Sequence, residues 1–258
     1  MSEAFYEPVA DGRFAATKHT VGPWSPDSQH LGPPSALLTR ALQRCAPREE
    51  FTIARITVEI LGPVPVAELE VRAEVQRPGR AVEMLGAELI ANGRAVARAT
   101  AWRIATTDTT EVAVTTVEPM APLADAVEVY APTQWGDGYL NAMEWQAVRG
   151  DWQTPGPAAS WARQRVALVD GEEPDGLQRL MAVADSGNGL SNWLDIRRWM
   201  FINTELSVHL LREPQGEWIG LDAQTAIGPT GLGIAGSVLH DRHGQVGRGA
   251  QELLVRRR

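Results

Sequence analysis

The chain is poor in the groups that cross-link small secreted proteins or bind structural metals. It has one cysteine, Cys45, among 258 residues, so no disulfide can form within it. Its five histidines show no metal-ligand spacing, and we expect no metal site. A chain of this length can bury a sizeable core without such links. The scarcity of cysteine favours a reducing compartment, so we predict a cytoplasmic protein.

Long apolar runs and excess positive charge are also missing. No uninterrupted apolar stretch approaches the roughly 20 residues of a membrane helix, and residues 1–11 do not resemble a signal peptide. We therefore expect no membrane span. The net charge of -8 disfavours a nucleic-acid partner, because phosphate binding needs a basic face. An anionic small ligand could still bind Arg197–Arg198 or residues 256–258, although such arginines are commonly only solvated.

An internal repeat is present. Each half ends in a predicted hairpin, with Asn92-Gly93 and His243-Gly244 at the turns. The two glycines are 151 positions apart, and Pro63 and Pro214 share that offset. A common offset across some thirty residues indicates a duplication.

Both halves predict the same order of elements: a strand, a helix and then four alternating strands. We expect helices at residues 34–44 and 177–184. The expected strands are 14–21, 52–61, 68–76, 82–90 and 95–104, then 160–168, 201–211, 217–226, 232–239 and 246–255. Such a helix buries one face on an antiparallel sheet, which indicates an α+β protein. We expect units at residues 1–105 and 158–258, joined by a segment, 106–157, with its own element near 142–148.

Three segments of the second half carry a family resemblance: Leu180-Met181-Ala182-Val183-Ala184-Asp185, the stretch from Glu205 to Pro214, and Ala250-Gln251-Glu252. They resemble the type II acyl-CoA thioesterases, tandem (double) hot-dog proteins whose units each pack a long helix on an antiparallel sheet. The resemblance implies hydrolysis of acyl-CoA to free acid and coenzyme A in lipid metabolism. It implies no cofactor beyond the coenzyme A of the substrate.

The resemblance also implies a site. The family holds its attacking water with an aspartate, a threonine or serine, and a glutamine. The aspartate falls on Asp185 and the glutamine on Gln251. The hydroxyl position falls on Asn203, which departs from the family pattern, and Thr204 is the alternative.

The residues themselves leave alternatives open. Asp185 follows an apolar segment, so it is either a half-buried base with a raised pKa or an exposed helix-end residue that starts a turn. Gln251 lies on a strand, where glutamine is more often a solvated side chain. Its counterpart at the offset of 151 is Thr100, and the first helix carries no acid. We therefore expect one site per chain.

Further candidates surround this site. Gly32, before two prolines, could present its N–H to a thioester oxyanion at a helix N-terminus, or could serve only the turn. Trp193 and Trp199 flank the site and could line an acyl pocket, although most tryptophans belong to cores.

Other functions are weaker or stay open. The sequence has no Gly-x-Ser-x-Gly nucleophile elbow. Hot-dog hydratases place a histidine five residues after an aspartate, but Leu190 and Gly32 stand five after Asp185 and Asp27. A non-catalytic acyl-CoA or lipid-binding protein remains the alternative to an enzyme. A tandem is compatible with both a monomer and a homo-oligomer.

Overall fold

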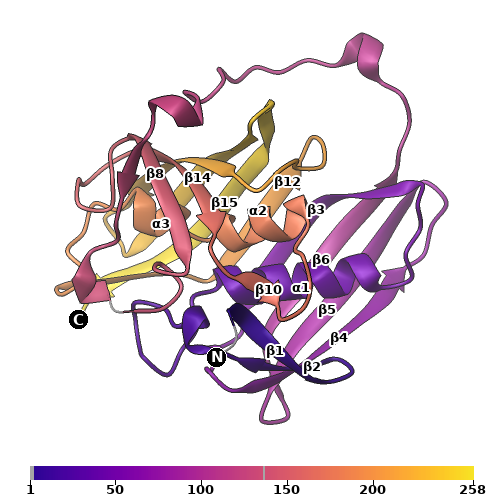
Figure 1. Ribbon diagram of the computed structural model, residues 1–258, viewed down its shortest axis with the longest axis horizontal. Helices are drawn as coiled ribbons and strands as arrows, with labels where there is room; N and C mark the ends of the chain where they lie inside the picture. The colour runs from indigo at the N-terminus through magenta and orange to yellow at the C-terminus, as the bar shows by residue number, and fades with distance from the viewer. Residues whose placement is uncertain (1–2, 136) are drawn as a thin grey trace.

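The computed structural model describes residues 3–135 and 137–258. Its strands form one sheet, in the order β10-β1-β2-β4-β5-β6-β3-β12-β15-β14-β13-β9-β8-β7, with β11 also paired to β15 (Figure 1). The strands are β1 (Ala4–Ala10), β2 (Arg13–Ala16), β3 (Phe51–Ile60), β4 (Glu68–Arg77), β5 (Val82–Ala91), β6 (Arg94–Ala105), β7 (Val127–Val129), β8 (Met143–Arg149), β9 (Ala158–Gln164), β10 (Ala167–Val169), β11 (Trp199–Asn203), β12 (Glu205–Leu210), β13 (Ile219–Ile227), β14 (Leu232–Asp241) and β15 (Gly244–Arg257). The helices are α1 (Gly32–Arg44), α2 (Gly176–Ala184) and α3 (Gly187–Leu190), with 3-10 turns at Lys18–Thr20, Thr110–Val112, Leu123–Asp125 and Thr133–Trp135.

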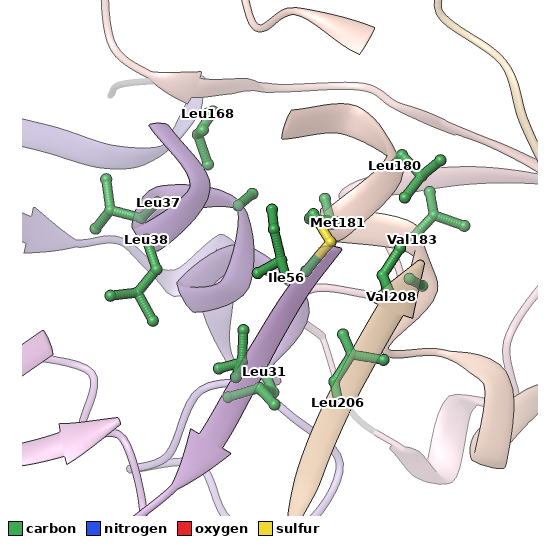
Figure 2. Close-up of a cluster of buried hydrophobic side chains, with 14 of the residues drawn as sticks. Leu31, Leu37, Leu38, Ile56, Leu168, Leu180, Met181, Val183, Leu206 and Val208 are labelled. Carbon is green, nitrogen blue, oxygen red and sulfur yellow. The ribbon is translucent and has the colours of Figure 1, made fainter. Parts of the chain in front are cut away.

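Two antiparallel arrays meet at the centre of the sheet. The array β4-β5-β6-β3 adjoins β12-β15-β14-β13 through the pair β3–β12. Thr57 lies opposite Ser207 in this pair, and their hydroxyl oxygens are 3.0 Å apart. The apolar residues of both strands, such as Ile56 and Leu206, point to the buried face (Figure 2). The alternation of apolar and polar residues along the strands thus produces one continuous apolar face of the sheet beneath the two helices.

Helices α1 and α2 pack against each other on this apolar face of the sheet. Two prolines follow Gly32 at the start of α1, where the missing N–H groups are not needed. Asp175 caps α2 by accepting a hydrogen bond from the Gln178 N–H at 2.9 Å. Met181 of α2 reaches toward Ile56 of β3 (Figure 2). Both predicted helices are confirmed, with α1 beginning two residues earlier than expected. None of the helices in the described part of the chain is long and apolar enough to cross a membrane.

The edges of the sheet differ from the prediction. The strand expected at 14–21 ends at Ala16, and a 3-10 turn follows. Strand β1 was not predicted; it pairs in parallel with β10, which comes from the other half of the chain. The expected element near 142–148 is the strand β8, which pairs with β9. Strand β1 also forms a hairpin with β2 around Asp11-Gly12, a local turn signal that the sequence analysis overlooked.

The two hairpins have the same irregularity, but not at the predicted offset. A bulge falls at Leu89/Ile90 in β5–β6 and at Leu239/His240 in β14–β15, 150 positions apart. Gly93 lies inside its turn, whereas Gly244 is already the first residue of β15. The matching of these two glycines was therefore wrong by one residue. By strand register the counterpart of Gln251 is the buried Ala101, not Thr100.

Candidate active site

A cavity of ≈ 470 Å³ lies where loops of the first half meet the second half. Its wall is mainly apolar and rich in aromatic rings, while Asp185 and Asn203 bring polar atoms to it. Most of the wall comes from four segments of the chain and seven single residues. The segments are Gly22–Ser25, Ser28–Leu31, Ile60–Val64 and Met200–Thr204, and the single residues are Trp135, Leu140, Trp152, Ser186, Asn188, Gly189 and Ile196.

Asp185 is the buried acid of this cavity. It directly follows α2, and its residue is 4% exposed. Its Oδ1 accepts hydrogen bonds from Nδ2 of Asn203 at 2.8 Å and Nε2 of Gln251 at 3.1 Å. Burial raises the pKa of Asp185 to about 7, although the hydrogen bonds from Asn203, Gln251 and the amides of Leu31 and Gly32 oppose the rise. A carboxyl group with this pKa can exchange a proton near neutral pH.

Gln251 is fixed in orientation by its neighbours. Its Oε1 accepts a hydrogen bond from the Asn188 N–H at 3.0 Å. Its Nε2 also donates to the main-chain oxygen of Asp185 at 3.1 Å. The amide therefore points its N–H groups at Asp185, and the residue is 2% exposed. Gln251 is a buried site residue, not the solvated strand residue of the alternative interpretation.

A bulge places Asn203, and not Thr204, beside Asp185. The strand predicted at 201–211 is broken at Thr204 into β11 and β12, and the register against β15 shifts there. Without the shift, Thr204 would share the buried face of Leu206. With it, Asn203 turns inward to Asp185, and Thr204 is exposed with its hydroxyl 3.4 Å from the Glu252 oxygen. Bulges redirect side chains in this way beside functional sites.

The first half contributes an imidazole to the site. Nδ1 of His30 lies 3.1 Å from Oδ2 of Asp185 and accepts a hydrogen bond from the Gly32 N–H at 3.0 Å. The ring of Tyr139 stacks on His30 with centroids 3.9 Å apart, and its hydroxyl bonds to Ala182 and Ser186. Burial lowers the pKa of His30 to about 3. The sequence reasoning considered Gly32 but missed His30 and Tyr139, because neither is near Asp185 in the chain.

Gly32 is required by close packing of the helices. A Cβ atom at this position would lie 2.3 Å from the main-chain oxygen of Ala182 in α2. The glycine thereby lets the start of α1 reach Asp185. Its N–H is engaged by His30, so an oxyanion role requires the imidazole to release it.

The tryptophans that line the cavity are not the predicted ones. Trp193 is 51% exposed, and its Nε1 donates to the Thr225 oxygen at 2.8 Å. Trp199 lies outside the lining and stacks with Arg257. The rings at the cavity are Trp24, Trp135, Trp152 and Phe201. Trp193 and Trp199 therefore do not line this cavity, although they follow Asp185 in the sequence.

Two family models together match most of the chain. The model of the acyl-CoA thioesterase N-terminal domain matches residues 20–104, and that of the C-terminal domain matches residues 119–255. The chain belongs to the acyl-CoA thioesterase family. The C-terminal match contains Asp185, Asn203 and Gln251, whereas His30 lies in the N-terminal match. The sequence matched no curated protein.

Solved structures share the fold of this thioesterase family member. A candidate thioesterase II of Thermobifida fusca is 18% identical with a TM-score of 0.76, covering 98% of this chain and 95% of the other. A hot-dog protein of Alicyclobacillus acidocaldarius is 15% identical with a TM-score of 0.75, covering 95% and 92%. The acyl-CoA thioesterase II of Mycobacterium marinum is 12% identical with a TM-score of 0.65, covering 98% and 95%. The fold is therefore of the hot-dog type.

Proposed function

We propose that this chain hydrolyses acyl-CoA thioesters to free acid and coenzyme A, with Asp185 as general base. The supporting observation is the buried carboxylate of Asp185, held by Asn203 and Gln251 on the wall of an apolar cavity. A water molecule in the cavity beside Asp185 and Asn203 could come within the about 2.6 to 3.2 Å that proton transfer needs. The apolar wall suits an acyl group.

The chemistry requires one proton to move twice. Asp185 takes a proton from water as the water oxygen attacks the thioester carbonyl. The tetrahedral intermediate then expels the coenzyme A sulfur as the carbon–sulfur bond breaks, and the Asp185 proton neutralises the thiolate. Asn203 and Gln251 hold the carboxylate in position to receive the proton. An N–H at the start of α1, that of Gly32 above all, stabilises the oxyanion once the substrate displaces His30 from it.

We also infer that the chain is a tandem of two hot-dog units, at residues 1–105 and 158–258, with 106–157 as the connection. The matching strand arrays and the two bulges 150 positions apart support a duplication. In the first unit Ala101 stands where Gln251 stands in the second. This difference supports a single site per chain, with the first unit contributing His30 and Gly32 to it.

Release of free thiol from a panel of acyl-CoA substrates, with short, long and aromatic acyl groups, tests the proposal. We expect turnover of at least one class. Calorimetric binding of the same substrates distinguishes the alternative function. Binding without turnover across the panel would indicate a non-catalytic acyl-CoA or lipid-binding protein.

A further inference from the structure

A row of side chains on β11 leads from Asn203 to a group of exposed arginines, Arg198 and Arg256–Arg258, which we call the rim. Alternate residues of a strand share a face, so Asn203, Phe201 and Trp199 of β11 lie on one face over about 13 Å. Their partners on β15 are Leu253, Val255 and Arg257. The face that presents Asn203 to Asp185 therefore ends at Trp199 and Arg257.

Two guanidinium groups are held on aromatic rings at this end. Arg257 lies 5.4 Å from the ring centre of Trp199, and Arg258 lies 5.3 Å from that of Trp24. Trp24 lines the cavity and packs edge-on against Phe201, with centroids 5.1 Å apart. The cation–π contact with Trp24 holds Arg258 beside the wall of the cavity, and the contact with Trp199 holds Arg257 at the end of β11.

The rim is a local concentration of positive charge on an acidic protein. Arg198 and Arg256–Arg258 are exposed, and none forms an ion pair with a residue that the structure describes. The neighbouring Arg197 is paired with Asp195, 3.1 Å from Nε to Oδ1. The net charge of the chain is -8. Arginines without an ion-pair partner among the described residues therefore lie at the end of β11 that carries Trp199.

We propose that Arg257 and Arg258 bind the phosphate groups of the substrate's thiol carrier, with Arg198 beside them. The inference rests on the proposed thioesterase function, because it places the thioester at Asp185 and the carrier arm along Phe201 and Trp199. Guanidinium groups bind phosphate through paired N–H donors, and stacking on a ring leaves these donors free at the edge of the group. The phosphates of coenzyme A and of a phosphopantetheine on a carrier protein share this chemistry.

The test compares one acyl group on different carriers. The substrates are the thioesters of coenzyme A, 3′-dephospho-coenzyme A, a phosphopantetheinylated carrier protein and the phosphate-free N-acetylcysteamine. The variant is Arg257→Gln/Arg258→Gln. The control, Arg72→Gln/Arg98→Gln, removes the same charge from exposed arginines on β4 and β6.

We expect the rim variant to lower the ratio of kcat/KM for acyl-CoA to kcat/KM for the N-acetylcysteamine thioester about tenfold or more. The control should leave this ratio within about twofold, because neither of its arginines lines the cavity. A loss confined to the coenzyme A thioester or to the carrier-protein thioester identifies which phosphate source the rim binds. An unchanged ratio in the rim variant overturns the inference.

Binding of coenzyme A separates this inference from the proposed function. If the wild-type protein hydrolyses no thioester, the proposed function fails, and calorimetry with coenzyme A and pantetheine still tests the rim. The rim is supported if coenzyme A binds the wild type about tenfold more tightly than the rim variant while pantetheine shows no such difference. Equal affinities overturn it.

Discussion

Nδ1 of His30 lies 3.1 Å from Oδ2 of Asp185, and the two side chains are only 13% and 4% exposed. An unprotonated ring nitrogen and an ionised carboxylate repel at this distance, so protonation of either group stabilises the pair. Burial lowers the pKa of His30 to about 3 and raises that of Asp185 to about 7. Below pH 7 the proton therefore belongs to Asp185, and His30 is a neutral imidazole whose Nδ1 accepts the Gly32 N–H.

This pairing predicts the pH dependence of catalysis. The base form of Asp185 accumulates as the pH rises through about 7, so kcat/KM should rise there and level off above pH 8. His30→Phe keeps a ring against Tyr139 but removes the nitrogen lone pair that repels the Asp185 carboxylate, so the apparent pKa should fall. The pH profile of both proteins measures this. A histidine that serves packing alone would leave the apparent pKa unchanged.

The same pKa predicts a stability change. Asp185 binds its proton more tightly in the folded state, so the wild-type protein loses stability as the pH rises from about 4 to about 7. The loss is about 4 kcal/mol for a pKa that changes from 3.8 unfolded to about 7 folded. Asp185→Asn does not titrate, so its free energy of unfolding should exceed that of the wild type more at pH 8 than at pH 5. Urea unfolding at both values checks this, and parallel curves would contradict it.

The bulge at Thr204 predicts different roles for neighbouring residues. Asn203→Ala removes a donor to the Asp185 carboxylate and should lower kcat about tenfold or more. Thr204→Ala should stay within about twofold, because that hydroxyl points to Glu252. Measuring kcat for both variants on one substrate compares them directly. A larger loss in Thr204→Ala would place the hydroxyl, and not the amide, in the site.

The sequence could predict those features that depend on local patterns, but not those that depend on contacts between distant segments of the chain. Alternation and turn residues located the two central arrays and both helices. They could not reveal the bulge at Thr204, which reverses the inward face midway along one predicted strand. His30 meets Asp185 only because the two halves of the chain pack together. The offset between the hairpins was wrong by one because glycine occurs at different positions in the two turns.

Close packing of α1 on α2 predicts the outcome of enlarging Gly32. Gly32→Ala places a Cβ atom 2.3 Å from the Ala182 oxygen, so the start of α1 must move away from Asp185. We expect a loss of activity together with a loss of stability of about 1 to 3 kcal/mol. Gly236→Ala is the control, because no atom lies within 4 Å of its added Cβ. Thermal unfolding and thiol release measure both effects. Equal behaviour of the two variants would remove Gly32 from the site.

Thiol release by Asp185→Asn tests the central claim most directly. The substitution keeps the size of the side chain and its bonds to Asn203 and Gln251, but removes the base. With folding verified by circular dichroism, kcat should fall by a factor of about 10² to 10⁴. Gln251→Ala, which removes only a positioning group, should lose less. Wild-type turnover in folded Asp185→Asn would contradict the account.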